Sequence, residues 1–168
     1  MLHPYAPDMP HHLAKAVGED NVRRSGLDWT VLQPCAYAQN LFSGPHPSEL
    51  VVPHAASSRF SFVDLDDVGD VAATVLADDA HVGASYELCG PVATSVTEVA
   101  DLAGRAVCEI DVGTWQSGPG AQLSAYARTA LAAMFTYYDR YGPVGNGHNM
   151  QWLLGRAPRS VAEVIATI

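Results

Sequence analysis

The chain has 168 residues, which is enough for one domain with its own core and too few for a second one. Its 18 acidic and 9 basic residues give a net charge of −9, and this balance excludes a nucleic-acid-binding surface, which needs clustered Lys and Arg. No apolar run is long enough to span a bilayer, and the three cysteines lack the spacing of metal ligands, so we expect a cytoplasmic protein that binds no membrane.

The first predicted elements are a helix and a strand. The helix covers about residues 10–24, with Asp8 as its N-cap and Gly26 as a left-handed stop. Residues 27–32 are mostly β-branched, aromatic or otherwise apolar, which predicts a strand covered on both faces, as in parallel sheets. We expect Leu13, Val17 and Asn21 to mark the inner face of this helix, and its apolar stripe is thin.

The middle of the chain predicts a loop, a short strand and a regular helix. Residues 44–56 are rich in proline and form a surface loop with some extended structure, and residues 58–63 alternate as a strand does. Residues 65–76 repeat apolar side chains at helical spacing, with Asp64 as the cap. The aspartates at this helix start lack the spacing of a calcium-binding loop, so we interpret them as caps near the positive end of the helix dipole: Asp64, Asp66, Asp67 and Asp70.

A second strand and helix follow. Residues 86–88 predict the strand, and a capping box of Ser95 and Glu98 opens a helix that stops at Gly104. Residues 108–112 alternate between apolar and acidic side chains, which predicts a further strand that is half buried.

The C-terminal third is predicted to be helical. A long helix extends from about residue 121 to residue 141, and a capping box of Ser160 and Glu163 opens a short final helix. The order of elements therefore predicts an α/β fold with a partly helical C-terminal region, in a single domain over residues 1–168.

Three titratable side chains lie at the start of the first predicted helix. His11 and Lys15 are four residues apart and share a face, and His12 is their neighbour. Such a group can transfer a proton at the mouth of a pocket, or it can be a solvated first turn. We take these three residues as the candidate catalytic group.

Three polar side chains lie at or beyond the end of the first predicted strand: Gln33, Tyr37 and Asn40. Ligands of α/β sheets bind beyond the carboxyl ends of strands, so we interpret these residues as candidate substrate contacts. An Asn at this place can equally cap a helix.

A zinc site would require two loops to converge, because no pair of histidines has the usual ligand spacing with a third ligand nearby. The histidines concerned are His3, His11, His12, His46 and His54. We therefore predict no metal site. Serine hydrolase chemistry has no support either, because the chain contains no G-x-S-x-G motif.

Several motifs in a fixed order resemble the NmrA-like group of atypical short-chain dehydrogenase/reductase folds, over nearly the whole chain. They are His11-His12-Leu13-Ala14-Lys15, residues 24–34, Tyr37-Ala38-Gln39-Asn40-Leu41, Phe62-Val63-Asp64-Leu65-Asp66-Asp67-Val68, Tyr86-Glu87-Leu88-Cys89-Gly90-Pro91 and Leu153-Leu154-Gly155-Arg156-Ala157-Pro158.

The resemblance implies a Rossmann-like fold whose usual cofactor is NAD(P). That family begins with a Gly-rich βαβ unit, and this chain has no G-x-G-x-x-G. We therefore expect a truncated Rossmann-like sheet made of the late strands, with a substrate-binding region and no cofactor for the isolated chain. The Tyr-x-x-x-Lys pair of standard short-chain dehydrogenases is matched as His11-x-x-x-Lys15, which changes the acid by several pKa units.

Three functions are consistent with this pattern. Our main expectation is a non-redox acid/base reaction on a small apolar molecule, such as cyclisation, isomerisation or proton transfer. The alternatives are an NAD(P)H-dependent oxidoreductase whose dinucleotide-binding half is missing from this chain, and a non-catalytic ligand-binding or regulatory module. We also expect a homodimer, because the face vacated by the missing strands would otherwise be exposed, with Trp29 and Val31 near the contact.

Overall fold

The computed structural model describes residues 2, 4, 6–44 and 48–168. His3 and His46, which the zinc hypothesis included, lie outside these residues. The described elements are α1 (Pro10–Arg23), β1 (Val31–Pro34), the 3-10 helix η1 (Ala38–Phe42), β2 (Glu49–Val52), β3 (Arg59–Phe60), α2 (Leu65–Leu76), the 3-10 helix η2 (Asp79–His81), β4 (Ser85–Leu88), β5 (Thr94–Ser95), α3 (Val96–Ala103), β6 (Ala106–Glu109), α4 (Val112–Ser117), α5 (Ala125–Arg140), α6 (His148–Leu154) and α7 (Val161–Ile165). None of these helices is long and apolar enough to cross a membrane.

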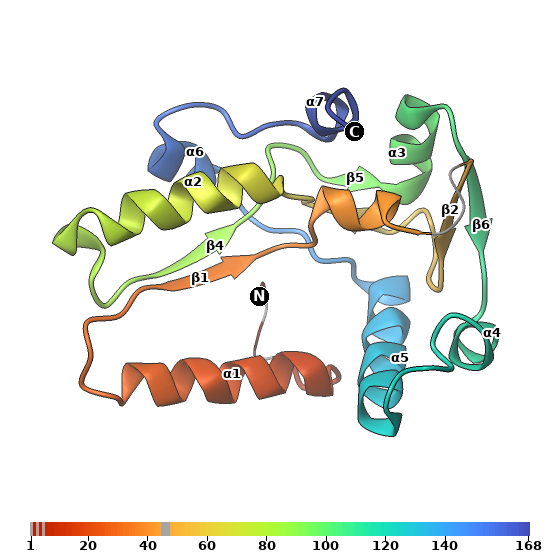
Figure 1. Cartoon of the computed structure of the whole chain (residues 1–168), viewed down its shortest axis with the longest axis horizontal. Helices are drawn as coiled ribbons and strands as arrows, with labels where there is room; N and C mark the ends of the chain where they lie inside the picture. The colour runs from red at the N-terminus through yellow and green to blue at the C-terminus, as the bar shows by residue number, and fades with distance from the viewer. Residues whose placement is uncertain (1, 3, 5, 45–47) are drawn as a thin grey trace.

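The strands form three short pairs. β1 and β4 are parallel, with Val31 beside Ser85 and Pro34 beside Leu88. β2 and β6 are also parallel, whereas β3 and β5 are antiparallel. In Figure 1 the β1–β4 pair lies between α1 on one side and α2 with α6 on the other. Parallel strands with helices on both faces confirm the predicted α/β class.

The start of the chain forms the predicted helix and strand with shifted boundaries. Met9, not Asp8, is the N-cap of α1, and a proline occupies the first turn of the helix. Gly26 has a φ of 74°, the left-handed conformation expected just after the helix. The predicted start of β1 at Leu27 is wrong: the ladder with β4 begins only where the Val31 amide donates to Ala84, and Leu27 is 71% exposed.

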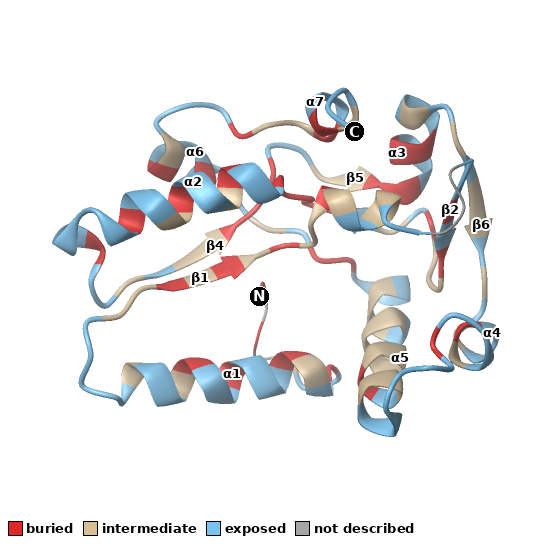
Figure 2. Cartoon of the chain, in the orientation of Figure 1, coloured by how far each residue is buried: buried red, intermediate tan, exposed pale blue. Residues whose placement is uncertain are grey.

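The inner face of α1 differs from the predicted one. Its buried side chains are His12, Ala16 and Glu19, whereas Leu13 and Val17 are 38% and 61% exposed. The buried carboxylate of Glu19 accepts a hydrogen bond from the Gln33 amide of β1 at 2.8 Å and pairs with Arg23 at 2.8 Å. A polar contact therefore fixes the orientation of α1 on the strand, and the buried side of the helix faces β1 (Figure 2).

Local capping residues determine where most of the other α-helices begin. The predicted capping boxes open α3 at Ser95 and α7 at Ser160. The long helix α5 begins later than predicted, because the side chain of Ser124 caps it by accepting a hydrogen bond from the Ala127 amide. Two of the described α-helices, α4 and α6, were not predicted. Asp111 caps α4, so β6 ends at Glu109 and does not continue to Val112 as expected, and α6 follows the glycine-rich turn after α5.

Two apolar clusters form the core, and Ala36 packs against both. One cluster lies around β1, β4, α2 and α6 and contains Leu2, Cys35, Val63, Val71, Val75, Leu88, Cys89, Met150 and Leu153. The other lies around β2, β3, α3 and α7 and contains Ala38, Leu50, Val52, Ala56, Phe60, Phe62, Val96, Val99, Ala100, Val161 and Val164. The chain segment that contains Ala36, just after β1, therefore joins the two halves of the core.

The aspartates at the start of α2 bind a segment that is distant in the sequence. Asp64 is the N-cap residue, but its side chain makes no capping hydrogen bond. Its carboxylate binds the Arg159 guanidinium at 2.6 Å instead. Asp67 accepts hydrogen bonds from the Arg156 guanidinium at 2.7 Å and from the Arg159 amide at 2.6 Å. These carboxylates thus anchor the segment between α6 and α7 to the start of α2.

Candidate functional site

A cavity of about 1000 Å³ lies beyond the carboxyl end of β1, where the chain turns into η1. Its walls come from the start of α1, the segment around η1, the end of β2, β3, and helices α4 and α5. Large apolar side chains dominate the lining, among them Phe60, Phe62, Trp115, Leu131, Met134, Phe135 and Tyr138. Such a cavity has the size and character of a site for a small apolar molecule.

The three candidate catalytic residues all line this cavity. His11 and Lys15 are one helical turn apart on α1, as predicted, and His12 is almost fully buried beside them. Burial lowers the pKa of His11, and the positive charge of Lys15 lowers it further. His11 is therefore neutral at neutral pH, and a proton can pass between it and a bound molecule.

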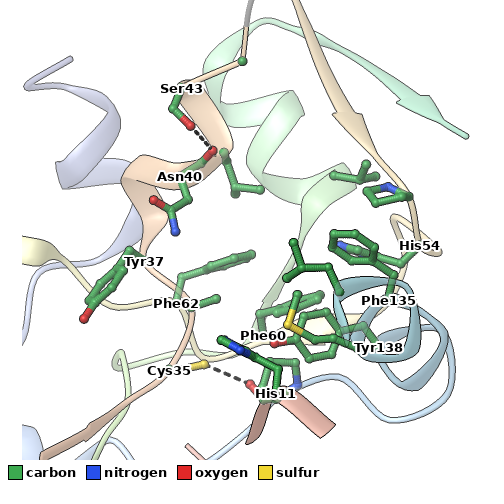
Figure 3. A pocket seen from close by; sticks show the side chains of 18 of the residues that line it. His11, Cys35, Tyr37, Asn40, Ser43, His54, Phe60, Phe62, Phe135 and Tyr138 are labelled. Carbon is green, nitrogen blue, oxygen red and sulfur yellow. Dashed lines mark hydrogen bonds between the residues drawn. The ribbon is translucent and has the colours of Figure 1, made fainter. Parts of the chain in front are cut away.

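Of the three candidate substrate contacts, two line the cavity and one does not. Tyr37, the residue before η1, and Asn40, within η1, line the cavity. Figure 3 places both on the wall opposite His54, Phe135 and Tyr138. Gln33 is not among the lining residues, because its side chain points to α1 and donates to Glu19. Gln33 thus positions the helix that carries His11 and Lys15, which corrects its assignment as a substrate contact.

Several cavity residues were not identified from the sequence. Leu131, Met134 and Tyr138 belong to a stripe on the long helix that is typical of a core-facing helix, and in the structure they face the cavity. Cys35 and His54 gave no local signal. Burial raises the pKa of the Cys35 thiol to about 12 and also raises that of Tyr138, so both side chains are uncharged at neutral pH.

No family model matches the chain. The NAD(P)H azoreductase of Xenophilus azovorans is 33% identical over 171 residues, which cover 94% of this chain and 59% of the azoreductase. The NADPH-dependent quinone oxidoreductase of Escherichia coli, solved with NADPH, has a TM-score of 0.83 at 18% identity over 99% of this chain and 62% of that one. The triphenylmethane reductase of Citrobacter sp., solved with NADP(H), has a TM-score of 0.76 at 15% identity, with 99% and 62% covered.

These likenesses show the fold, a mixed α/β fold of the Rossmann-like kind that NAD(P)H-dependent reductases share. A nucleoside-diphosphate-sugar epimerase from Staphylococcus aureus has it too, with a TM-score of 0.75 at 15% identity. The chain spans less than two thirds of the length of each of these proteins. The matches cover nearly all of this chain, and they do not confirm the expectation that it holds only a C-terminal part.

Two expectations from the sequence are corrected by these relatives. Non-redox proton transfer, cyclisation or isomerisation is contradicted, because the similar proteins are named as NAD(P)H- or NADPH-dependent reductases, and the oxidoreductase alternative agrees better with them. The expectation of no cofactor is contradicted as well, because the neighbours were solved with NADPH or NADP(H). The non-redox expectation rested on the missing glycine motif and on His11 at the position of the catalytic tyrosine, and the expectation of no cofactor rested on the missing motif.

Proposed function

We propose that this chain belongs to an NmrA-like, NAD(P)H-dependent oxidoreductase that reduces an apolar aromatic compound. The observation that carries the proposal is the 33% identity to an NAD(P)H azoreductase over 94% of the chain. The cavity supports it, because aromatic rings from β3, α4 and α5 and polar groups from α1 and η1 line the same space. A flat apolar molecule placed there has both ring contacts and proton donors within reach.

The residues at the polar side of the cavity fit the reactive end of a nicotinamide cofactor, which supplies a hydride when bound. Lys15 and Asn40 offer an ammonium and an amide, groups that hydrogen-bond ribose hydroxyls and a carboxamide. Gly90 and Gly142 make the closest approaches of any described glycine, and each approaches the protein's own backbone, at Phe62 and Arg59. Both close approaches therefore serve packing within the chain, and we place the cofactor contacts on side chains of the cavity.

Reduction by hydride transfer also consumes a proton, and the α1 residues are placed to supply it. We assign this proton to Lys15, with neutral His11 one turn away to relay it and His12 packed behind them. Tyr37 and Asn40 line the cavity around η1, and we assign them to orienting the substrate. These roles follow from the position of each side chain on the cavity lining.

Replacing Lys15 tests the proton-transfer role. Lys15→Met keeps the apolar stem and removes the ammonium, so turnover is expected to fall at least about tenfold. The measurement is NADPH oxidation, followed by absorbance, with an azo compound or a quinone as acceptor. Arg24→Met is the matched control, because Arg24 is an exposed cation just after α1 that does not line the cavity.

The same assay separates the remaining functions. Unchanged turnover in Lys15→Met, with Arg24→Met also unchanged, would contradict the role of Lys15. Failure of the wild-type chain to oxidise NADPH with any aromatic acceptor would contradict the proposed function. NADPH binding without turnover, seen by calorimetry, would favour the binding or regulatory alternative.

The homodimer stays a prediction. The outer surface of α1 and the turn after it offer exposed apolar side chains, Leu13, Val17 and Leu27, whereas Val31 is only 9% exposed within the chain and adds little to a contact. We propose that two copies meet through this α1 surface. Sedimentation at micromolar concentration is expected to give a dimer, and Val17→Glu is expected to give monomers. A folded wild-type monomer with a concentration-independent melt would contradict the proposal.

A further inference from the structure

His54 lines the cavity, and the proposed function assigns it no role. It follows β2, and its ring is surrounded by aromatic side chains: the centroid lies 5.2 Å from that of Phe60, 5.9 Å from that of Tyr138 and 6.3 Å from that of Phe135. In Figure 3 it lies with Phe135 and Tyr138 on the wall opposite Tyr37 and Asn40. The imidazole therefore packs among three aromatic rings that belong to β3 and α5.

The turn that carries His54 is held by two carboxylates from different elements. The Ala55 amide donates to Asp139 of α5, and the Ala56 amide donates to Glu109 of β6 at 2.7 Å. The peptide next to the imidazole is therefore fixed from both sides, and the Ala55 carbonyl is fixed with it. A side chain supported in this way is pre-organised, as the side chains of binding sites are.

The hydrogen bond of His54 defines which ring nitrogen carries the proton. Nδ1 lies 3.1 Å from the Ala55 carbonyl oxygen, and because a carbonyl can only accept, Nδ1 is the donor. Burial lowers the pKa of His54 and outweighs the Ala55 hydrogen bond and the negative charges of Asp139 and Glu109, which act in the opposite direction. The imidazole is thus neutral at neutral pH, and Nε2 is a hydrogen-bond acceptor.

We propose that Nε2 of His54 accepts a hydrogen bond from the hydroxyl group of an aromatic ligand, so that the cavity selects phenols and naphthols over arenes without a donor. The rings of Phe60, Phe135 and Tyr138 pack against the arene, and His54 binds its hydroxyl substituent. An acceptor of this kind discriminates because a ligand without a donor leaves it unpaired in an apolar site. The inference rests on the proposed function where it names a substrate class, but ligand binding needs no cofactor.

Calorimetric titration of the full chain with 2-naphthol and with 2-methoxynaphthalene tests this role, without NADPH. The wild type is expected to bind the naphthol about tenfold more tightly than the ether. His54→Phe keeps an aromatic ring and removes the acceptor, so the ratio of the two affinities is expected to fall to about one. Comparing the ratio between variants cancels the differences in size and hydrophobicity between the ligands.

Two further variants keep the test specific. His54→Gln retains an acceptor and is expected to recover part of the preference, which a merely structural role would not do. His148→Phe is the matched control, because His148 is exposed and does not line the cavity, and the wild-type ratio is expected there. Circular dichroism establishes that each variant is folded.

Three results would overturn the inference: equal affinities in the wild type, a preference retained in folded His54→Phe, or no saturable binding of either ligand. Its failure is distinct from that of the proposed function. A His54-dependent preference without any NADPH oxidation would support the inference and contradict the reductase. NADPH oxidation in a chain that binds both ligands equally would contradict the inference and support the reductase.

Discussion

Gly90→Ala is expected to destabilise the protein by at least about 3 kcal/mol. A Cβ at this position would lie 1.9 Å from the backbone oxygen of Phe62, and the Gly90 amide donates to the Ser61 carbonyl at 3.2 Å. The strained contact is with backbone, so no side chain can rotate to relieve it. Separating the two segments would also displace Phe62 from the cavity wall.

Gly69→Ala is expected to have the opposite effect on the stability of the same chain. Gly69 lies inside α2, and an added Cβ meets nothing within 4 Å. Alanine at this helical position is expected to stabilise by about 0.5–1 kcal/mol, because it reduces the conformational entropy of the unfolded chain. Urea unfolding followed by circular dichroism measures both variants. A loss of less than about 1 kcal/mol in Gly90→Ala would mean that the two segments separate easily, against the argument from backbone contact.

Asp67→Ala is the second substitution with a large expected effect, a loss of about 3 kcal/mol in the free energy of unfolding. The Asp67 side chain is fully buried, and it accepts hydrogen bonds from the Arg156 guanidinium and the Arg159 amide. Its removal leaves that amide without its acceptor and releases the segment between α6 and α7 from α2. The arginine side chains are about 40% exposed and can rehydrate, which limits the loss.

Asp70→Ala is the matched control for Asp67→Ala. Asp70 also binds Arg156, at 2.8 Å, but its side chain is 62% exposed. An ion pair in water contributes little, so the loss is expected to stay within about 0.5 kcal/mol. Thermal unfolding of both variants measures the two stability losses. Equal losses would show that burial of the Asp67 carboxylate does not matter and that the anchoring role assigned to it is wrong.

The sequence by itself determined those elements whose signals are local. The capping boxes at Ser95 and Ser160 were predicted correctly because each involves residues only three positions apart. The helix after Asp64 was also predicted, because its apolar spacing is regular over the whole element. His11 and Lys15 were placed together for the same reason, since one helical turn fixes their relation.

The tertiary structure decided whatever depends on residues distant in the chain. The buried face of α1 is set by Gln33, fourteen positions beyond Glu19, so a stripe counted along the helix could not identify it. The cavity combines α1 and η1 with α5, and no spacing within α5 indicates that Met134 and Tyr138 line a cavity. The position of the Ala55 carbonyl, which accepts a hydrogen bond from His54, likewise depends on carboxylates from α5 and β6. Hydrogen bonds and packing across the fold create these features, and the order of neighbouring residues carries no direct signal of them.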